Sequence, residues 1–137
     1  MQLRRQGQIV VISSLASLQP VPHIWLYSAS KTALSYLVEG LYRDLKPQGI
    51  QVTSICPGFI KTEMTAEQGL PEAWTMELQP AVDRIMKAID QRKRSVYFPW
   101  WMFAGLKMIS FLPDRLRLAA LDRIAIYLRG SADTGPE

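Results

Sequence analysis

Three short runs of apolar residues, many of them β-branched, stand out along the chain. The first, Gln8–Ser13, reads QIVVIS and predicts a strand buried on both faces, as in a parallel sheet. The second, Gln51–Cys56, reads QVTSIC and stops at Pro57-Gly58. A third and shorter strand is predicted over Ser95–Phe98.

Between and after these runs, apolar residues recur at helical spacing. Ser28–Leu45 predicts a long helix, and its apolar stripe consists of Ala33, Leu34, Leu37, Val38, Leu41 and Leu45. Pro80 suits the first turn of a second helix, whose apolar face consists of Val82, Ile85, Met86 and Ile89. Asp114–Leu128 predicts an amphipathic third helix, while Leu15–Ile24 and Phe59–Gln79 are expected to be irregular.

The order of these elements indicates the fold class. A strand, a long helix and a further strand form a βαβ unit, whose two strands run parallel. We therefore expect an α/β fold with a parallel sheet of about three strands flanked by helices. No repeat or linker divides the chain, so residues 1–137 are expected to form a single domain, ending in an apolar and amphipathic tail over 99–130.

Composition narrows the class of protein. The hydrophobic content of 48% and charged content of 20% are typical of a globular protein and exclude a disordered one. The net charge is +4, but the basic residues are dispersed and not interleaved with aromatics, which argues against nucleic-acid binding.

The lone Cys56 cannot form an internal disulfide and fits the reducing cytoplasm. The first residues lack a signal-peptide pattern, and the longest apolar stretch, Val96–Leu112, is interrupted and slightly shorter than the roughly 18 residues that a membrane span needs.

The chemistry-bearing residues are Ser14, Tyr27 and Lys31. Tyr27 and Lys31 are four residues apart at the start of the long helix, so their side chains share one face. An ammonium beside a phenol stabilises the phenolate, and such a tyrosine can exchange protons near neutral pH. Ser14 follows the first strand, where open α/β sheets form their ligand crevice. Each residue taken alone also fits a structural role, the pair on a helix surface and the serine in a turn.

Taken together, these motifs resemble the short-chain dehydrogenase/reductase family. GQIVVISSLAS is followed by a loop containing prolines and then by YSASKTAL, with 13 positions from Ser14 to Tyr27. The next strand ends in CPGFIKTEM, which is similar to the family's Pro-Gly-x-x-x-Thr segment. The resemblance covers Gly7–Thr65 and extends more loosely to Phe98. It implies a partial, doubly wound Rossmann-like sheet and the catalytic half of the family's fold.

The resemblance also implies roles at the site. Tyr27 would be the general acid and base, Lys31 would favour its ionised form and bond the nicotinamide ribose, and Ser14 would hold the substrate oxygen. The Ile60 backbone and the Thr62 hydroxyl would meet the carboxamide. The residues expected to contact NAD or NADP are Tyr27, Lys31, Pro57, Gly58, Ile60 and Thr62.

Two functions remain open. The first is an NAD(P)-dependent oxidoreductase that interconverts an apolar alcohol and a ketone or aldehyde, works as a homo-oligomer and binds no metal. The second is a truncated, catalytically incomplete fragment that acts at most as a subunit-binding or structural remnant. The glycine-rich turn that binds pyrophosphate in this family is absent from the 137 residues, where eight glycines are scattered.

A few other residues have weaker signals. Phe98–Phe103 is strongly aromatic and is expected to cover the substrate pocket or a dimer surface; the alternative is a peripheral membrane contact of a cytoplasmic protein, through residues 98–128. Met64 is a candidate for substrate contact. His23 could also reach the substrate, but it is expected in solvent, as is Glu63. Cys56 is expected to be a buried small hydrophobe rather than a nucleophile.

Overall fold

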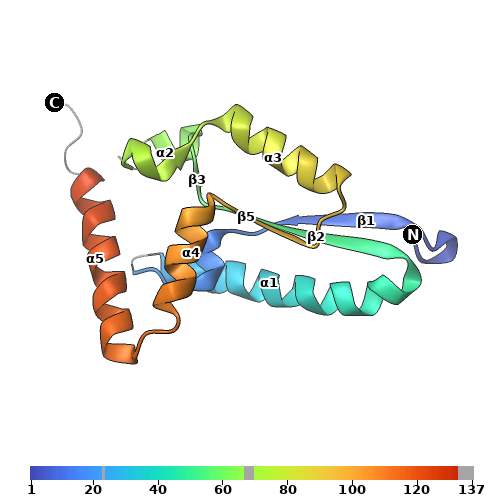
Figure 1. Cartoon of the computed structure of the whole chain (residues 1–137), viewed down its shortest axis with the longest axis horizontal. Helices are drawn as coiled ribbons and strands as arrows, with labels where there is room; N and C mark the ends of the chain where they lie inside the picture. The colour runs from blue at the N-terminus through green and yellow to red at the C-terminus, as the bar shows by residue number, and fades with distance from the viewer. Residues whose placement is uncertain (23, 67–69, 133–137) are drawn as a thin grey trace.

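A three-stranded parallel sheet lies at the centre of the computed structural model, which describes residues 1–22, 24–66 and 70–132 (Figure 1). Its strands are β1 (Gly7–Ile12), β2 (Ile50–Pro57) and β5 (Ser95–Phe98), in the spatial order β1-β2-β5. Both pairings are parallel, with Gly7 opposite Ile50 and Ser54 opposite Ser95. The predicted fold class and the three strands are confirmed, the strand ends within one residue.

The prediction that the first strand is buried on both faces is wrong. Every residue of β1 keeps some exposure, and Ile12 is 52% exposed. The central strand β2 is instead the fully covered one, with Val52, Thr53 and Ile55 completely buried. The physical reason is position, since within the described residues β1 pairs on one side only and β2 on both.

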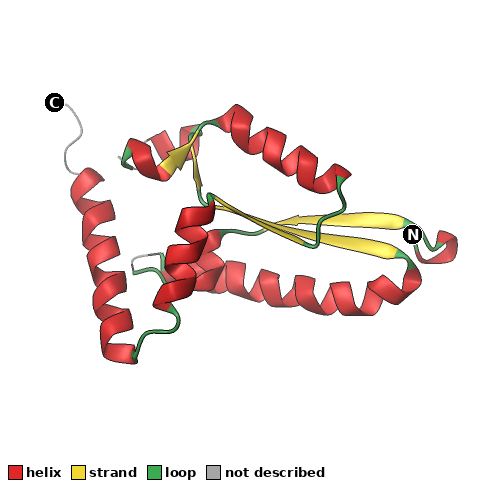
Figure 2. Ribbon diagram, in the orientation of Figure 1, coloured by secondary structure: helices red, strands yellow, loops and turns green. Residues whose placement is uncertain are grey.

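Two helices cover opposite faces of this sheet. The long helix α1 (Trp25–Leu45) lies along one face and α3 (Leu78–Asp90) along the other, as Figures 1 and 2 show. Helix α1 begins three residues earlier than predicted, which places Tyr27 within its first turn. Its predicted apolar stripe is only partly correct, because Val38 is buried but Ala33 and Leu37 are exposed.

The segment predicted to be irregular contains small regular elements. β3 (Phe59–Ile60) and β4 (Thr75–Met76) pair in parallel as a separate two-stranded sheet. Between them lie α2 (Glu63–Ala66) and the 3-10 turn η4 (Glu72–Trp74). Further 3-10 turns are η1 (Gln2–Arg4), η2 (Leu15–Leu18) and η3 (Lys46–Gln48).

The C-terminal tail forms two helices rather than one. α4 (Trp100–Ile109) follows β5 directly, and α5 (Asp114–Ala132) returns beside it (Figure 1). The core contains two clusters of buried side chains. One consists of Leu15, Cys56 and Met102 of α4, and the other of Ile55, Phe98 and Ala81 of α3. Among the described residues no helix has the length and apolar character required to cross a membrane.

Candidate active site

The carboxyl ends of the three parallel strands meet at one edge of the sheet. The amide of Ser13, just after β1, donates to the Ile55 carbonyl of β2 at 2.7 Å. The amide of Gly58, just after β2, donates to the Phe98 carbonyl of β5, also at 2.7 Å. Ligands of open α/β sheets bind outside this edge, so it is the candidate active site.

Ser14 caps the turn that leaves β1. Its Oγ accepts a hydrogen bond from the Ala16 amide at 3.1 Å, which fixes the side chain at the start of η2. The hydroxyl proton points to the Pro57 carbonyl at 3.5 Å, a long and therefore weak contact. The serine is half-buried, so its hydroxyl can turn towards a better acceptor at modest cost.

Tyr27 and Lys31 lie on the first turns of α1. The Lys31 ammonium is 5.5 Å from the centroid of the Tyr27 ring and donates to the Ile12 carbonyl at 3.5 Å. It therefore connects the tyrosine with the end of β1. The Tyr27 side chain is 47% exposed, which leaves its phenol accessible to a ligand.

No hydrogen bond joins Ser14 to Tyr27 within the described part of the chain. Each group is instead fixed to its own element, the serine to η2 and the tyrosine to α1. Neither hydroxyl donates a strong hydrogen bond within the described residues, since the Ser14 hydroxyl donates only at 3.5 Å.

Ser13 is a residue that the sequence motifs did not single out. It is buried, and its hydroxyl donates to the Lys31 carbonyl at 3.1 Å and shares a 3.0 Å hydrogen bond with the Ser35 hydroxyl. Thr32 makes a second link, donating to the Ser17 carbonyl at 3.0 Å. These contacts attach the start of α1 to the loop after β1, so they set where Lys31 lies. The repeated serine at the strand end was the signal for Ser13.

Gly58 is required by packing at the end of β2. A Cβ atom built on it would lie 2.9 Å from Sδ of Met102 and 3.0 Å from Cδ of Pro99. The neighbour Pro57 is buried and takes the Ser14 contact on its carbonyl. Because the side chains of Met102 and Pro99 approach so closely, a larger residue at this position must displace them.

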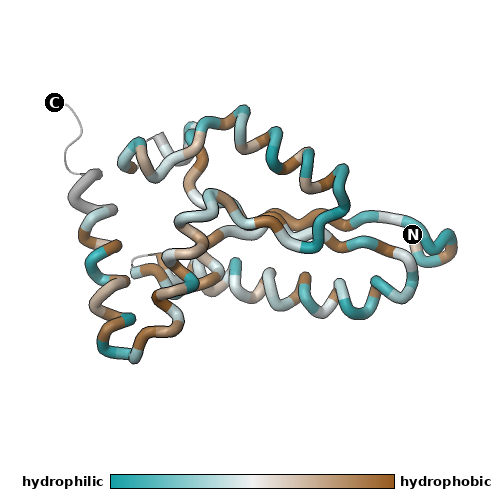
Figure 3. Tube along the Cα trace, in the orientation of Figure 1, coloured by the Kyte–Doolittle hydropathy of each residue, from teal (hydrophilic) through white to brown (hydrophobic). Residues whose placement is uncertain are grey.

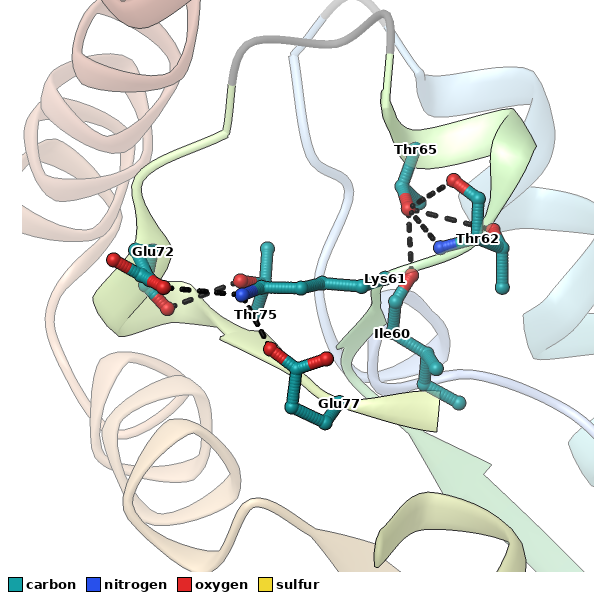
Figure 4. Close-up of polar contacts among 7 residues, drawn as sticks. All are labelled: Ile60, Lys61, Thr62, Thr65, Glu72, Thr75 and Glu77. Atoms are coloured by element: carbon teal, nitrogen blue, oxygen red, sulfur yellow. Dashed lines mark hydrogen bonds and ion pairs between the residues drawn. The ribbon is translucent and has the colours of Figure 1, made fainter. Parts of the chain in front are cut away.

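Thr65 binds the backbone groups of the adjoining segment (Figure 4). Its hydroxyl donates to the Ile60 carbonyl at 2.6 Å and accepts from the Thr62 amide at 2.9 Å. The two threonine hydroxyls are 3.3 Å apart, and Thr62 is exposed. Two residues expected to meet the carboxamide are thus held in place by a third that the sequence motifs did not indicate.

Lys61 makes ion pairs that link the residue after β3 to residues on either side of β4 (Figure 4). Its Nζ contacts Oε1 of Glu72 at 3.1 Å and Oε1 of Glu77 at 2.5 Å, and its amide donates to the Met76 carbonyl. Hydrogen bonds to Glu77 and then Glu72 raise the pKa of the Lys61 ammonium. The two carboxylates are mostly exposed and the Lys61 side chain is 38% exposed, so this network orients the segment more than it stabilises the fold.

The remaining candidates fall outside the site or outside the described residues. Cys56 is 1% exposed, and burial raises the pKa of its thiol, which agrees with a packing role. Glu63 is exposed, as expected. His23 and the side chain of Met64 lie outside the described residues. Within the described residues, no three His, Cys, Asp or Glu side chains gather as a metal site.

Comparison with known proteins gives a family model and relatives that agree with one another. The family model "short chain dehydrogenase" matches residues 1–73, more than half of the chain. An uncharacterized oxidoreductase of Myxococcus xanthus is 39% identical over 121 residues, which cover 88% of this chain and 48% of that protein. Epidermal retinol dehydrogenase 2 of Homo sapiens is 35% identical over 126 residues, with coverage of 88% and 41%. The chain thus spans about half the length of the curated relatives that it matches.

Solved structures give the same fold. A short chain dehydrogenase from Burkholderia cenocepacia in complex with NADP superposes with a TM-score of 0.69 at 28% identity, covering 84% of this chain and 46% of that one. A short-chain dehydrogenase from Sphingobium yanoikuyae in complex with NADPH gives 0.65 at 27% identity, with coverage of 82% and 48%.

Proposed function

This chain belongs to the short-chain dehydrogenase family, and we propose that it carries the catalytic side chains of an oxidoreductase acting on an alcohol or carbonyl compound. The single observation that carries the proposal is the position of Lys31, which lies against the Tyr27 ring and bonds the end of β1, two residues before Ser14. This arrangement supports the proposal because it holds an ammonium near a phenol at the end of the strand that leads to Ser14.

In the proposed reaction the chain handles the proton. During reduction, the Tyr27 hydroxyl donates its proton to the carbonyl oxygen of the substrate, while the Ser14 hydroxyl turns from Pro57 to donate to the same oxygen. During oxidation, the Tyr27 oxygen takes the proton of the alcohol. The nearby Lys31 ammonium favours the negative charge that develops on the phenol oxygen.

The proposed cofactor is a nicotinamide dinucleotide, which when bound supplies or accepts the hydride. An amide group needs an acceptor for its N–H and a donor for its oxygen, and the Ile60 carbonyl and Thr62 hydroxyl are groups of these kinds. The carbonyl retains a lone pair beyond the one that Thr65 uses. NADP and NADPH in two solved relatives support testing the phosphorylated cofactor first.

A second candidate is a chain that binds another subunit, such as a further copy of itself, and turns nothing over. The observation that favours it is the outer face of α1, where Tyr36 is 78% exposed and Leu37 57% exposed. The single-sided pairing of β1 in the described residues leaves backbone donors and acceptors for a further strand.

One experiment distinguishes the two. Residues of this chain replace the matching region of the Myxococcus xanthus relative, and the chimera is assayed with NADPH and NADP on apolar ketones and alcohols, including retinol. Turnover that Tyr27→Phe removes supports the oxidoreductase. A folded chimera that binds NADPH without turning over any compound favours the second candidate, and turnover that survives Tyr27→Phe contradicts the assigned proton donor.

A further inference from the structure

Helices α4 and α5 form a hairpin whose turn is rich in exposed apolar side chains. Phe111 is 80% exposed at the turn. We call the following four exposed residues the hairpin tip: Met108, Phe111, Leu112 and Leu116. Figure 3 shows hydrophobic segments bordering this turn, at the end of the hairpin away from the start of α4.

Several apolar side chains elsewhere on the hairpin pack against the rest of the chain. Met102 of α4 and Leu121 of α5 are buried, and Phe103 stacks on Tyr97 at 4.4 Å between centroids. Trp101 meets the edge of Trp74 at 6.0 Å. The tip therefore lies beyond the packing that holds the hairpin to the sheet. It brings four exposed apolar side chains together at the turn, while Trp100, Leu118 and Ile126 are exposed along the two helices.

The charges around the tip are positive. Lys107 and Arg115 flank it and are both exposed. Its one acidic neighbour, Asp114, is neutralised by an ion pair with Arg117 at 2.8 Å. A lipid surface with anionic headgroups is complementary to this arrangement, because it offers an apolar layer beneath a layer of negative charge.

We propose that the hairpin tip docks on the surface of an anionic lipid bilayer. Phe111 and Leu112 enter the boundary between headgroups and acyl chains, and Lys107 and Arg115 bind lipid phosphates. The proposed contact is centred on the tip and not on Trp101, whose ring meets the edge of Trp74. The inference goes beyond the proposed oxidoreductase function and does not depend on it.

The first test is flotation of the full chain with vesicles. We expect binding to vesicles of phosphatidylcholine with phosphatidylserine, weaker binding to phosphatidylcholine alone, and loss of the difference in high salt. Phe111→Ser lowers vesicle affinity by about tenfold or more. Tyr36→Ser is the matched control, because that aromatic ring is equally exposed, at 78%, but lies on α1. Lys107→Gln with Arg115→Gln weakens binding to anionic vesicles only.

A second measurement locates the contact directly. Phe111→Cys is labelled with an environment-sensitive dye, while the native Cys56 is buried and protected from labelling. The dye emission shifts to the blue with anionic vesicles, and the same dye on Tyr36→Cys does not shift. An unchanged dye at position 111, or equal loss of binding in Phe111→Ser and Tyr36→Ser, overturns the proposal. It is also overturned if light scattering shows that Phe111→Ser breaks an oligomer that does not bind vesicles, because the tip is then an interface between copies.

Discussion

The hydroxyl of Thr65 donates a hydrogen bond of 2.6 Å to the backbone carbonyl of Ile60 (Figure 4). The same oxygen accepts from the amide of Thr62, so one side chain holds both ends of the segment between them. Because Thr62 precedes the short helix α2, this is half of an N-terminal capping arrangement. The consequence for the proposed site is that the direction of the Ile60 carbonyl depends on a residue five positions away.

Removing this hydroxyl should disturb the segment in two measurable ways. Thr65→Val leaves the Thr62 amide without its partner, and we expect a loss of about 1 kcal/mol in the free energy of unfolding by urea. In the chimera it should also weaken NADPH binding, because the carbonyl is no longer fixed. Thr65→Ser keeps the hydroxyl and should restore most of both. Equal NADPH affinity in the valine and serine variants contradicts the positioning role.

Tyr27→Phe should separate chemistry from stability. The Tyr27 hydroxyl has no hydrogen-bond partner in the described part of the chain and the ring is 47% exposed, so its loss should leave the unfolding transition unchanged. Loss of a general acid should reduce kcat in the chimera by about 10²-fold or more. Lys31→Ala should also be severe, and it should raise KM for the cofactor as well. The measurements are steady-state kinetics with circular dichroism melts of each variant.

The elements found correctly from the sequence are those with a clear period. The three strands are continuous apolar runs, and α1 and α3 show apolar residues at helical spacing. Helix α4 was missed because Trp100–Ile109 is apolar nearly all round and therefore shows no amphipathic pattern. β3 and β4 were missed because strands of two residues are too short to show any alternation.

The site residues divide in the same way, into those that a sequence pattern reveals and those that only folded contacts reveal. Ser14, Tyr27 and Lys31 were found because their spacing is a property of the chain itself. Ser13 and Thr65 were not, because their importance comes from contacts with Lys31 and Ile60 that only the folded chain brings about. Burial of β1 was overestimated for a related reason, since the number of neighbours of a strand is set by the sheet and not by the strand's own residues.

Stability should depend on pH through Glu39. Hydrogen bonds from Arg94 and then Arg43 lower the pKa of this carboxyl group. A carboxyl group whose pKa is lowered on folding contributes stability above its ordinary pKa of 4.5, and the contribution disappears as the pH falls through the lowered value. Glu39→Gln should therefore reduce the urea midpoint at pH 7 more than at pH 3. Asp90→Asn, which alters an exposed carboxylate, should show a smaller difference between the two pH values.

Cys56 should react slowly with thiol reagents while the chain is folded. Burial raises the pKa of this thiol, so less of it is in the reactive thiolate form at pH 8. The side chain is also packed against Leu15 and Met102, which blocks access. The rate of reaction with a colorimetric disulfide reagent should rise by orders of magnitude in urea. Rapid stoichiometric modification of the folded chain at pH 8 would show that β2 opens more readily than its burial indicates.

The 137 residues alone should not bind a nicotinamide dinucleotide tightly. The proposed contacts, Ile60 and Thr62 among them, reach only the nicotinamide end, and no glycine-rich turn for the pyrophosphate occurs in the sequence. The polypeptide should also self-associate, because β1 has one free edge in the described residues and α1 exposes Tyr36 and Leu37. Titration of NADH and NADPH, followed by cofactor fluorescence with light scattering on the same sample, checks both expectations. Saturable micromolar binding by a monomer would mean that other side chains of this chain hold the pyrophosphate, and the chimera would then be unnecessary for measuring turnover.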